Sequence, residues 1–581
     1  MRNEVTVSVV LVFILSVAAF AQDPASQDAD LKKARRAKIV DSISRDAAEL
    51  RLPENRAFVS AKLGAEFWKD DQERASTLFK NSITDLIAAQ AVAESNKKPN
   101  QQNYDLLNSL SLRPSLLSII ASVDAEFALS SLYRTRPTAV QKALSQGSAN
   151  TKINSSSGNF AQIAQQEISL EQRFIRILAD QKPERSMAFL KESIRKNLSS
   201  ETFEMLKRVW SKDPAGGNEL ANDVIDRLIS KSFIASNNQP NYDLLNLTNS
   251  IFADYLRERS PEERSIAFAE SGMRSLAGKL LSTYIERGAS IGYIPLDQLG
   301  PIAKRFSPAS FDLLRKVAVN TRGGFSPRPN LGNDEAYTKL MSSNPTADAM
   351  ITEAKKFPVD TRRSIYINAA NKLSDAGQYD RAVALLNDNF EGDALENAIS
   401  SLNWYYAHLL INRGEYDAAE AMIMEFNESN RISGLTSLAT TIYNKDPDAN
   451  RSRANAILQR ARTFLPARPE NGNEFTQLMQ LINTMALVEP TEAFRNFEPV
   501  IDQINQIAEA WAIVTAFQGG GTIRQGEYVM TNGFSFGVYI DPSTFSTLAR
   551  KDFGRTTTLI DGVQRRELRI LVLTTLLESG F

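Results

Sequence analysis

Short amphipathic segments dominate this chain from Leu31 to about Phe517. Apolar residues recur in them at spacings of three and four, which is the period of a helix with one buried face. Loops rich in Asn, Pro, Gly, Ser and Lys separate these segments, for example at 96–103, 212–218 and 466–473. Strand-like alternation is scarce over this span, so the pattern predicts an all-α fold.

Short phrases recur along the same span, which is typical of stacked repeats. The phrase Asn-Tyr-Asp-Leu-Leu-Asn at 103–108 returns at 241–246, and looser versions occur at 202–206 and 310–314. Their aromatic positions are separated by 99, 39 and 69 residues. These separations equal about three, one and two units of roughly 35 residues, the size of a helical hairpin. The sequence therefore predicts an array of helical hairpins, an α-solenoid.

Each phrase has the composition of a helix start. A polar residue before the aromatic can accept the free N–H groups of the first turn, and the acidic residue after it favours the positive end of the helix dipole. We expect Tyr104 and Tyr242 to pack on the preceding helix. A role for these tyrosines in contacting a partner is the alternative.

The repeat is more regular after the break at 322–329. The segments Ala-Gly-Gln-Tyr-Asp-Arg-Ala at 376–382 and Arg-Gly-Glu-Tyr-Asp-Ala-Ala at 413–419 resemble the inter-helix turn of the tetratricopeptide repeat. Their tyrosines are 37 residues apart, against about 34 in that family. Asn389 and Phe426 depart from the small residue that the family prefers, and the closing Pro is missing from both repeats.

This resemblance covers about 335–466 and implies antiparallel helix pairs in which two alanines allow close approach. The residues assigned to repeat structure are Tyr104, Tyr242, Ala370, Gly377, Tyr379, Ala382, Ala407, Gly414, Tyr416 and Ala419.

The C-terminal part has a different composition. Gly residues at 519–521 and the pair Asn532-Gly533 bracket two segments, 527–530 and 534–540, that are rich in Tyr, Val, Phe and Ile. An Asn-Gly pair favours a tight turn, so we expect a small hairpin or long loop here. Helices follow from about 543 to 577. The predicted organisation is a signal peptide (1–21), an N-terminal helical-repeat region (22–320), a linker (321–335), a tetratricopeptide-like region (336–517) and a C-terminal part (518–581).

The first 22 residues predict export. Arg2 precedes an apolar run from Val5 to Ala18, and Ala-Phe-Ala follows, so we expect cleavage between Ala21 and Gln22. A membrane anchor is the alternative, but the run of about 14 residues is shorter than the about 20 that a spanning helix needs. We therefore predict a bacterial protein, periplasmic or secreted, with no transmembrane anchor after cleavage.

Composition excludes several kinds of chemistry. The chain contains no Cys and one His, so thiolate sites and two-histidine zinc sites are ruled out. The net charge of −1 shows no excess of basic residues over the whole chain, such as binding to nucleic acid requires. His408 lies in an apolar helical segment, and we expect a structural residue in a buried helix rather than a general base. We predict no cofactor, no metal site and no nucleic-acid partner.

Three local patterns resemble functional motifs but are better explained without a binding or catalytic role. The glycines at 519–526 lack the Gly-Lys-Ser/Thr ending of a phosphate loop, which favours a flexible connection. The basic stretch 32–38 covers an apolar stripe, which favours the solvated face of a helix. Glu578-Ser579-Gly580 is similar to the catalytic Glu-Ser of soluble lytic transglycosylases, but no lysozyme-like domain follows it, so no residue is assigned a catalytic role.

The predicted function is that of a non-enzymatic protein-binding or scaffolding protein of the bacterial cell envelope. Its expected partner is a protein or an extended peptide, because stacked hairpins form long concave surfaces. The alternative is a secreted carbohydrate-active protein, either a hydrolase or a binder. Carboxylates for a general acid and base are plentiful, but the four Trp residues lie in apolar helical contexts rather than in a sugar cleft.

Overall fold

The computed structural model describes most of the chain as helices. The described residues are 24–95, 112–145, 158–234, 240–257, 263, 265–291, 295–321, 337, 340–341, 343–517, 523–530 and 541–580. The predicted signal peptide, with Ala21 and Gln22, lies outside them, as do Tyr104 and the glycines at 519–521. The all-α helical-hairpin fold predicted from the sequence is confirmed.

The helices in chain order are α2 (Pro24–Ala47), α3 (Pro53–Phe67), α4 (Gln72–Ser95), a helix at 112–121, α6 (Ala125–Arg134), α7 (Thr138–Ser145), α8 (Gly158–Gln181), α9 (Pro183–Lys196), α10 (Thr202–Trp210), α11 (Pro214–Ser230), α12 (Tyr242–Leu256), α13 (Glu270–Ile291), α14 (Leu296–Phe306) and α15 (Pro308–Thr321). The second half contains α17 (Ala347–Ala354), α18 (Val359–Asp375), α19 (Tyr379–Asn389), α20 (Gly392–Arg413), α21 (Tyr416–Met424), α22 (Glu428–Lys445), α23 (Pro447–Thr463), α24 (Gly472–Val488), α25 (Pro490–Phe517), α26 (Pro542–Lys551), α27 (Phe553–Asp561) and α28 (Arg566–Ser579). Two short strands, β1 (Ile523–Arg524) and β2 (Glu527–Tyr528), lie between α25 and α26.

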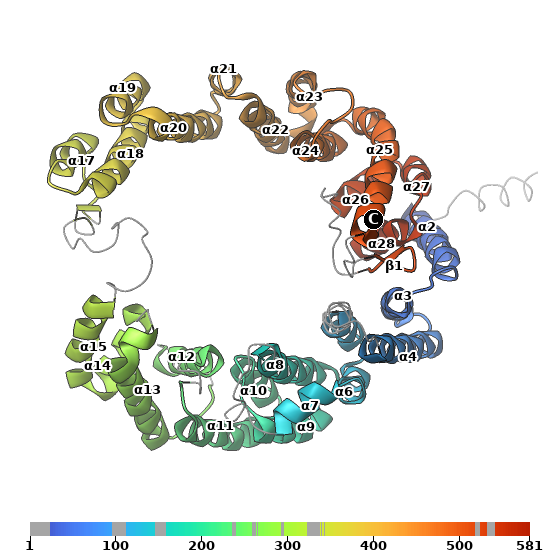
Figure 1. Cartoon of the computed structure of the whole chain (residues 1–581), viewed down its shortest axis with the longest axis vertical. Helices are drawn as coiled ribbons and strands as arrows, with labels where there is room; N and C mark the ends of the chain where they lie inside the picture. The colour runs from blue at the N-terminus through green and yellow to red at the C-terminus, as the bar shows by residue number, and fades with distance from the viewer. Residues whose placement is uncertain are drawn as a thin grey trace, which may run out of the picture.

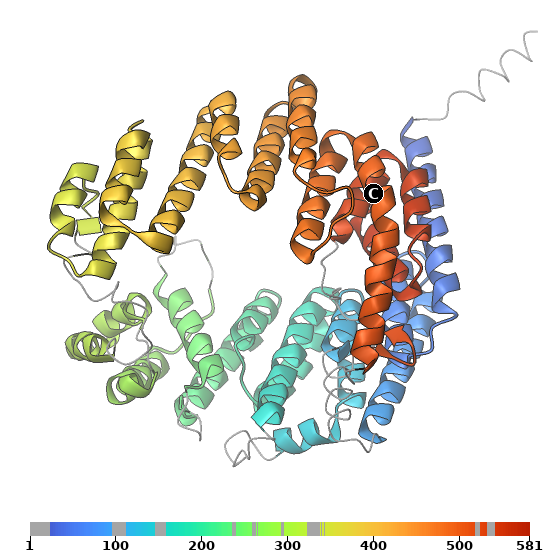
Figure 2. The ribbon, with the colours of Figure 1, turned by 45° about the horizontal axis from the view of Figure 1, so that its top comes forward.

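The described helices form a two-layered ring with a gap between α15 and α17 (Figure 1). Helices α8, α12, α22, α24, α26 and α28 line its inner side, and α9, α11, α21, α23, α27 and α2 lie on its outer side. The first and last described helices meet on one side of the ring, opposite α15 and α17 (Figures 1 and 2). The ring is therefore made by one chain whose two described ends are neighbours.

Local sequence signals explain where many helices begin. Asp213, Asp446 and Asp541 each accept a backbone N–H of the following turn through the side chain, and a proline follows each of them. Proline is favoured at the first helical position because its missing N–H would be unpaired there anyway. Asn241 caps α12 in the same way by accepting from the N–H of Leu244. The helix start predicted from the repeated phrase is present at that site.

Small residues allow the antiparallel helices to approach closely. A Cβ atom on Gly64 in α3 would lie 2.5 Å from the Phe79 ring in α4, which is closer than van der Waals contact allows. The two helices accordingly form one of the most extensive contacts in the ring. Replacing this glycine would force the helices apart.

The tetratricopeptide-like region has the arrangement that the resemblance implies. Gly377 and Gly414 have φ of +75° and +78°, so both use the left-handed conformation that glycine adopts at helix ends. The four alanines of the pattern, Ala370, Ala382, Ala407 and Ala419, are all buried. Tyr379 stacks on Tyr406 with ring centroids 4.4 Å apart. The helix pairs α18/α19, α20/α21 and α22/α23 are packed hairpins.

Two expectations from the sequence, for Tyr242 and His408, differ from the structure. Tyr242 is 58% exposed, so it does not pack on the preceding helix, because capping by Asn241 turns the chain without needing the aromatic. His408 is exposed on a partly buried helix and stacks on Trp404 at 5.4 Å. The described strands β1 and β2 form a short hairpin that turns at Gln525-Gly526, which both have positive φ, and the turn predicted at Asn532-Gly533 lies outside the described residues.

The hydrophobic core is continuous across the junction of the two ends. Buried residues of α2 to α15 and of the second half of α20 to α28 belong to one cluster. A separate cluster spans α17, α18, α19 and the first half of α20. The core thus ends in the middle of the sequence, near α15, and passes through the junction of the termini without a break.

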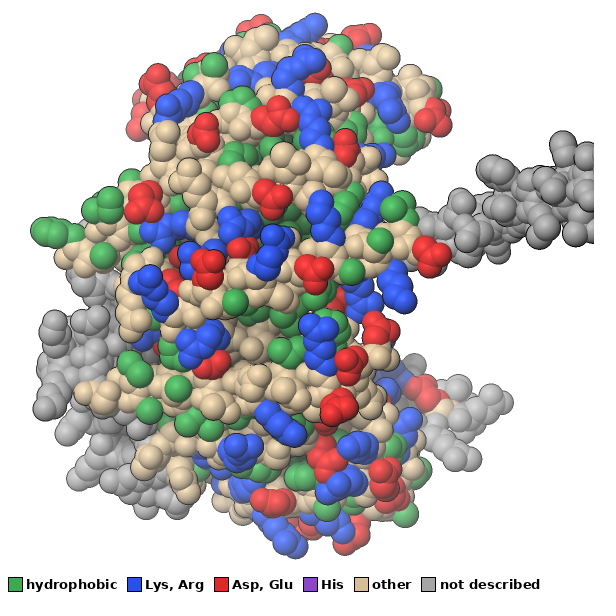
Figure 3. All heavy atoms as spheres, turned by 90° about the vertical axis from the view of Figure 1, so that its right-hand side faces the viewer, with side chains coloured by type: hydrophobic (Ala, Val, Ile, Leu, Met, Phe, Trp, Pro, Cys, Tyr) green, Lys and Arg blue, Asp and Glu red, His purple; other side chains and the backbone are tan. Residues whose placement is uncertain are grey.

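Helix α28, on the inner side of the ring, packs against α2, on the outer side, although the two helices come from opposite ends of the chain. Arg569 donates through Nε and Nη2 to the two carboxylate oxygens of Asp46, at 2.7 and 2.5 Å. Arg566 forms an ion pair with Glu49 at 2.8 Å. Figure 3 shows the outside of this part of the ring, where Lys and Arg side chains alternate with Asp and Glu. No helix within the described residues is long and apolar enough to cross a membrane.

Candidate functional site

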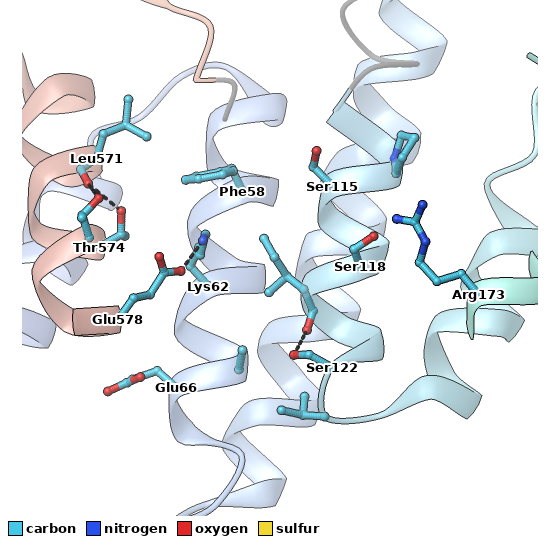
Figure 4. A pocket seen from close by; sticks show the side chains of 15 residues that line it. Phe58, Lys62, Glu66, Ser115, Ser118, Ser122, Arg173, Leu571, Thr574 and Glu578 are labelled. Atoms are coloured by element: carbon cyan, nitrogen blue, oxygen red, sulfur yellow. Dashed lines mark hydrogen bonds and ion pairs between the residues drawn. The ribbon is translucent and has the colours of Figure 1, made fainter. Parts of the chain in front are cut away.

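A cleft lies where the two ends of the chain meet (Figure 4). It has a volume of about 860 Å³ and is open to solvent. Side chains from α3, the helix at 112–121, α8 and α28 line it, so it draws on three distant parts of the sequence. The lining residues are Phe58, Lys62, Ala65, Glu66, Pro114, Ser115, Ser118, Ile119, Ser122, Val123, Arg173, Leu571, Thr574, Thr575 and Glu578.

One wall carries a pair of opposite charges. Lys62 of α3 forms an ion pair with Glu578 of α28, across the junction of the two termini (Figure 4). The Lys62 ammonium also lies 5.6 Å from the centre of the Phe58 ring, where the ring quadrupole attracts a cation. Phe58 itself is buried, as is Thr574, so this wall presents the charged pair and the half-buried Thr575, whose hydroxyl donates to the Leu571 carbonyl, rather than an aromatic face.

The opposite wall carries hydroxyl groups and a cation. Ser115, Ser118 and Ser122 lie on or just after the helix at 112–121 and face the cleft (Figure 4). Arg173 of α8 is exposed beyond them, with its guanidinium 3.8 Å from the Glu201 carboxylate. This long contact leaves most of the donors of Arg173 available to a ligand.

A buried charge cluster holds the serine-bearing helix in place. Arg113 donates to both oxygens of Glu167 in α8, at 2.6 and 2.9 Å, and both side chains are at least 96% buried. Arg113 also donates to Thr135 Oγ1 and to the Leu132 carbonyl, at 2.8 and 2.5 Å. Arg136 binds the same glutamate at 2.9 Å. The cluster therefore fixes the helix at 112–121 against both α6 and α8.

A second buried network fixes α3 against the C-terminal part. The Glu527 carboxylate of β2 accepts from the backbone N–H groups of Arg51 and Leu52, at 2.5 and 3.0 Å. Leu52 is the N-cap of α3 and its apolar side chain cannot accept a hydrogen bond. The C-terminal strand thus supplies the cap that α3 lacks locally.

Asn55 completes this network. Its amide donates to the Tyr528 carbonyl at 2.8 Å and accepts from the Met530 N–H at 2.7 Å. Glu567 of α28 accepts from the Tyr528 N–H at 2.8 Å, so the strand segment is held from both sides. The network positions α3 and α28, which together carry the charged wall of the cleft.

The cleft suits polar recognition. Its two carboxylates are each bound by a cation, Glu66 by Arg36 and Glu578 by Lys62. The displaced pKa values of described carboxyl groups lie elsewhere: burial raises the pKa of Asp243, and a hydrogen bond from Lys182 lowers that of Glu126. Hydroxyls and paired charges bind the N–H and C=O groups of an extended chain without a stacking surface.

The nine described residues assigned to repeat structure do not line this cleft, and Tyr104 lies outside the described residues. Sequence reasoning also missed Arg113, Glu167, Glu527 and Asn55, which lie in helical or loop patterns without a local motif. Each is a charged or amide residue inside an apolar stripe. That pattern indicates a buried polar contact only when the partner residue is known. Within the described residues, no group of three or more His, Asp or Glu side chains is placed to hold a metal ion.

Comparisons with known proteins assign the chain to no family. No protein-family model matches the chain, and no curated protein matches its sequence. Among solved structures it is similar to one described as a "Circular tandem repeat protein with novel repeat topology and enhanced subunit contact surfaces". The two share 13% identity over 94% of this chain and 98% of the other, with a TM-score of 0.14. The helix packing described above is the basis for the arguments that follow.

Proposed function

We propose that this protein is an exported, non-enzymatic binding or scaffolding protein of the bacterial cell envelope that holds an extended segment of a partner protein in the cleft at its termini. The observation that carries this proposal is the composition of that cleft. Ser115, Ser118 and Arg173 face the Lys62–Glu578 pair, so donors and acceptors line both walls. An extended polypeptide needs both along its length.

The alternative ligand is a glycan, and the composition of the cleft favours a peptide over it. Sugar rings are usually held by stacking on exposed aromatic faces, in addition to hydrogen bonds. Phe58, the aromatic residue in the cleft, is 2% exposed, and Lys62 lies near its face. The export step of the proposal rests on the predicted signal peptide, with cleavage at Ala21 and Gln22.

Capture of the partner tests the proposal. Mature protein starting at Gln22 is immobilised, incubated with envelope extract of its own source and analysed by mass spectrometry. We expect one or two proteins at near-stoichiometric yield, and we expect Arg173→Ala to reduce their recovery about tenfold, because a charge-assisted hydrogen bond is lost.

The matched control is Arg274→Ala on the outer helix α13. Arg274 is likewise exposed and has one ion pair, with Glu270 at 3.3 Å, but it lies far from the cleft. Equal recovery with wild type and Arg274→Ala, with loss in Arg173→Ala, places the partner in the cleft. Equal recovery with all three proteins contradicts the proposed cleft, and an oligosaccharide that raises the melting temperature of the protein would favour the glycan alternative.

A further inference from the structure

Side-chain amides on helices hold non-helical segments at several places in this protein. Asn55 in α3 binds the carbonyl of Tyr528 and the N–H of Met530. Asn505 in α25 repeats this pattern, donating to the Gly562 carbonyl at 2.9 Å and accepting from the Gln564 N–H at 2.9 Å. In both cases one amide binds the C=O of one residue and the N–H of the residue two positions later.

Helix α11 uses the same chemistry along its length. Asn218 accepts from the N–H of Ala267 at 2.9 Å, and Asn222 accepts from the N–H of Ala269 at 3.0 Å. The two asparagines are one helical turn apart, and the two alanines are alternate residues of a segment without helical structure. The spacing of two asparagines one helical turn apart thus matches the spacing of alternate N–H groups along an extended backbone.

One amide of this kind faces a cleft. Asn249 of α12 lines a cleft of about 640 Å³ between α12 and α14, together with Asn246, Ser250 and Gln298. Its Nδ2 donates to Oε1 of the exposed Gln298 at 3.0 Å. Its Oδ1 is buried and has no hydrogen-bond partner within the described residues. A buried acceptor without a partner is unfavourable, so the site gains stability if a donor is supplied.

The rest of the cleft defines what else the ligand presents. Phe252 and Ile302 are buried beneath it, and Leu256 and Pro301 form apolar parts of its sides. The cation at the rim, Arg257, is paired with Glu263. An apolar side chain therefore fits the cleft better than an acidic one.

We propose that the α12–α14 cleft binds an extended peptide segment through Asn249, with an apolar side chain of that segment above Phe252 and Ile302. In this proposal the exposed Gln298 side chain moves away and opens the Asn249 amide, whose Oδ1 is covered in the unliganded protein; the ligand then donates an N–H to Oδ1 and accepts from Nδ2 through the carbonyl two residues earlier. This inference goes beyond the proposed function, because it places a second peptide-binding site elsewhere on the ring, with its own mode of recognition.

A random peptide library tests the inference while the natural partner is unidentified. A phage-displayed library of 12-residue peptides is selected on the immobilised mature protein and counter-selected on the Asn249→Ala variant. We expect enriched sequences that share an apolar residue. A synthetic, fluorescein-labelled peptide of that sequence should bind Asn249→Ala about tenfold more weakly than wild type in an anisotropy titration, because two hydrogen bonds are lost.

Gln298→Ala is the matched variant in the same cleft. Because Gln298 competes with the ligand for Asn249, its removal should leave affinity unchanged or increase it, whereas a merely structural role for both amides would weaken binding in both variants. Each variant must have the circular dichroism spectrum and melting temperature of the wild-type protein, so that a change in binding does not reflect misfolding. Failure to enrich peptides, or equal binding by Asn249→Ala, overturns the inference. Failure here combined with successful Arg173-dependent capture would remove this site and leave the proposed function standing.

Discussion

Replacing Glu167 with glutamine should lower the free energy of unfolding of the N-terminal helices by about 3–5 kcal/mol, because it leaves the buried Arg113 guanidinium without its charge partner. Urea denaturation followed by circular dichroism measures this loss. Hydrogen exchange should locate it, with the largest loss of protection in the helix at 112–121, which Arg113 attaches to α8. The serine wall of the cleft should loosen at the same time.

An exposed glutamate provides the control for this substitution. Glu270→Gln removes an ion pair with Arg274 on the surface of α13, and such helical pairs contribute about 0.3–0.5 kcal/mol. The double variant Arg113→Met/Glu167→Leu should recover part of the stability, because it removes both buried charges together. A loss in Glu167→Gln no larger than that in Glu270→Gln would contradict the structural role of the cluster.

Replacing Glu527 with alanine should destabilise the junction of the termini by about 2–4 kcal/mol. The substitution removes the acceptor of the Arg51 and Leu52 N–H groups and of the Asn55 amide. Because Leu52 cannot cap α3 itself, the first turn of that helix should lose its protection against hydrogen exchange. Urea denaturation gives the magnitude, and exchange of 50–58 gives the location.

Two further variants sharpen this prediction. Glu527→Gln keeps one carbonyl oxygen as an acceptor and should lose less stability than the alanine variant. Glu509→Gln removes only an exposed partner of Arg565, at 2.9 Å, and should leave the junction protected. Exchange rates at 50–58 that are the same in Glu527→Ala as in wild type would show that the C-terminal strand does not cap α3.

The hairpin array could be predicted from the sequence because its signals are local. Apolar spacing, proline after a capping residue and glycine at helix ends depend on residues within one turn of each other. Gly377 and Gly414 adopt the left-handed conformation that the resemblance to tetratricopeptide turns implies. The alanines that precede them by seven residues are buried, as close helix packing requires.

The ring and its cleft could not be predicted in the same way. Glu527 and Leu52 are 475 residues apart, and nothing in either segment indicates the other. Composition predicts a small hairpin or long loop near 527–540; within the described residues a short hairpin turns just before this segment, at Gln525-Gly526, where Gly526 has positive φ. Apolar neighbours predict packing for Tyr242 and His408, but helix orientation exposes both.

Closure of the ring by its own termini is the central claim, and a distance measurement between α2 and α28 tests it most directly. The chain has no cysteine, so Glu49→Cys/Arg566→Cys introduces the only two sites for spin labels. The side chains of these residues form an ion pair at 2.8 Å, so pulsed electron resonance should give one short, narrow distance, broadened and lengthened by Glu527→Ala. A broad distribution of long distances in the chain with native Glu527 would contradict the junction of the termini and the cleft built on it.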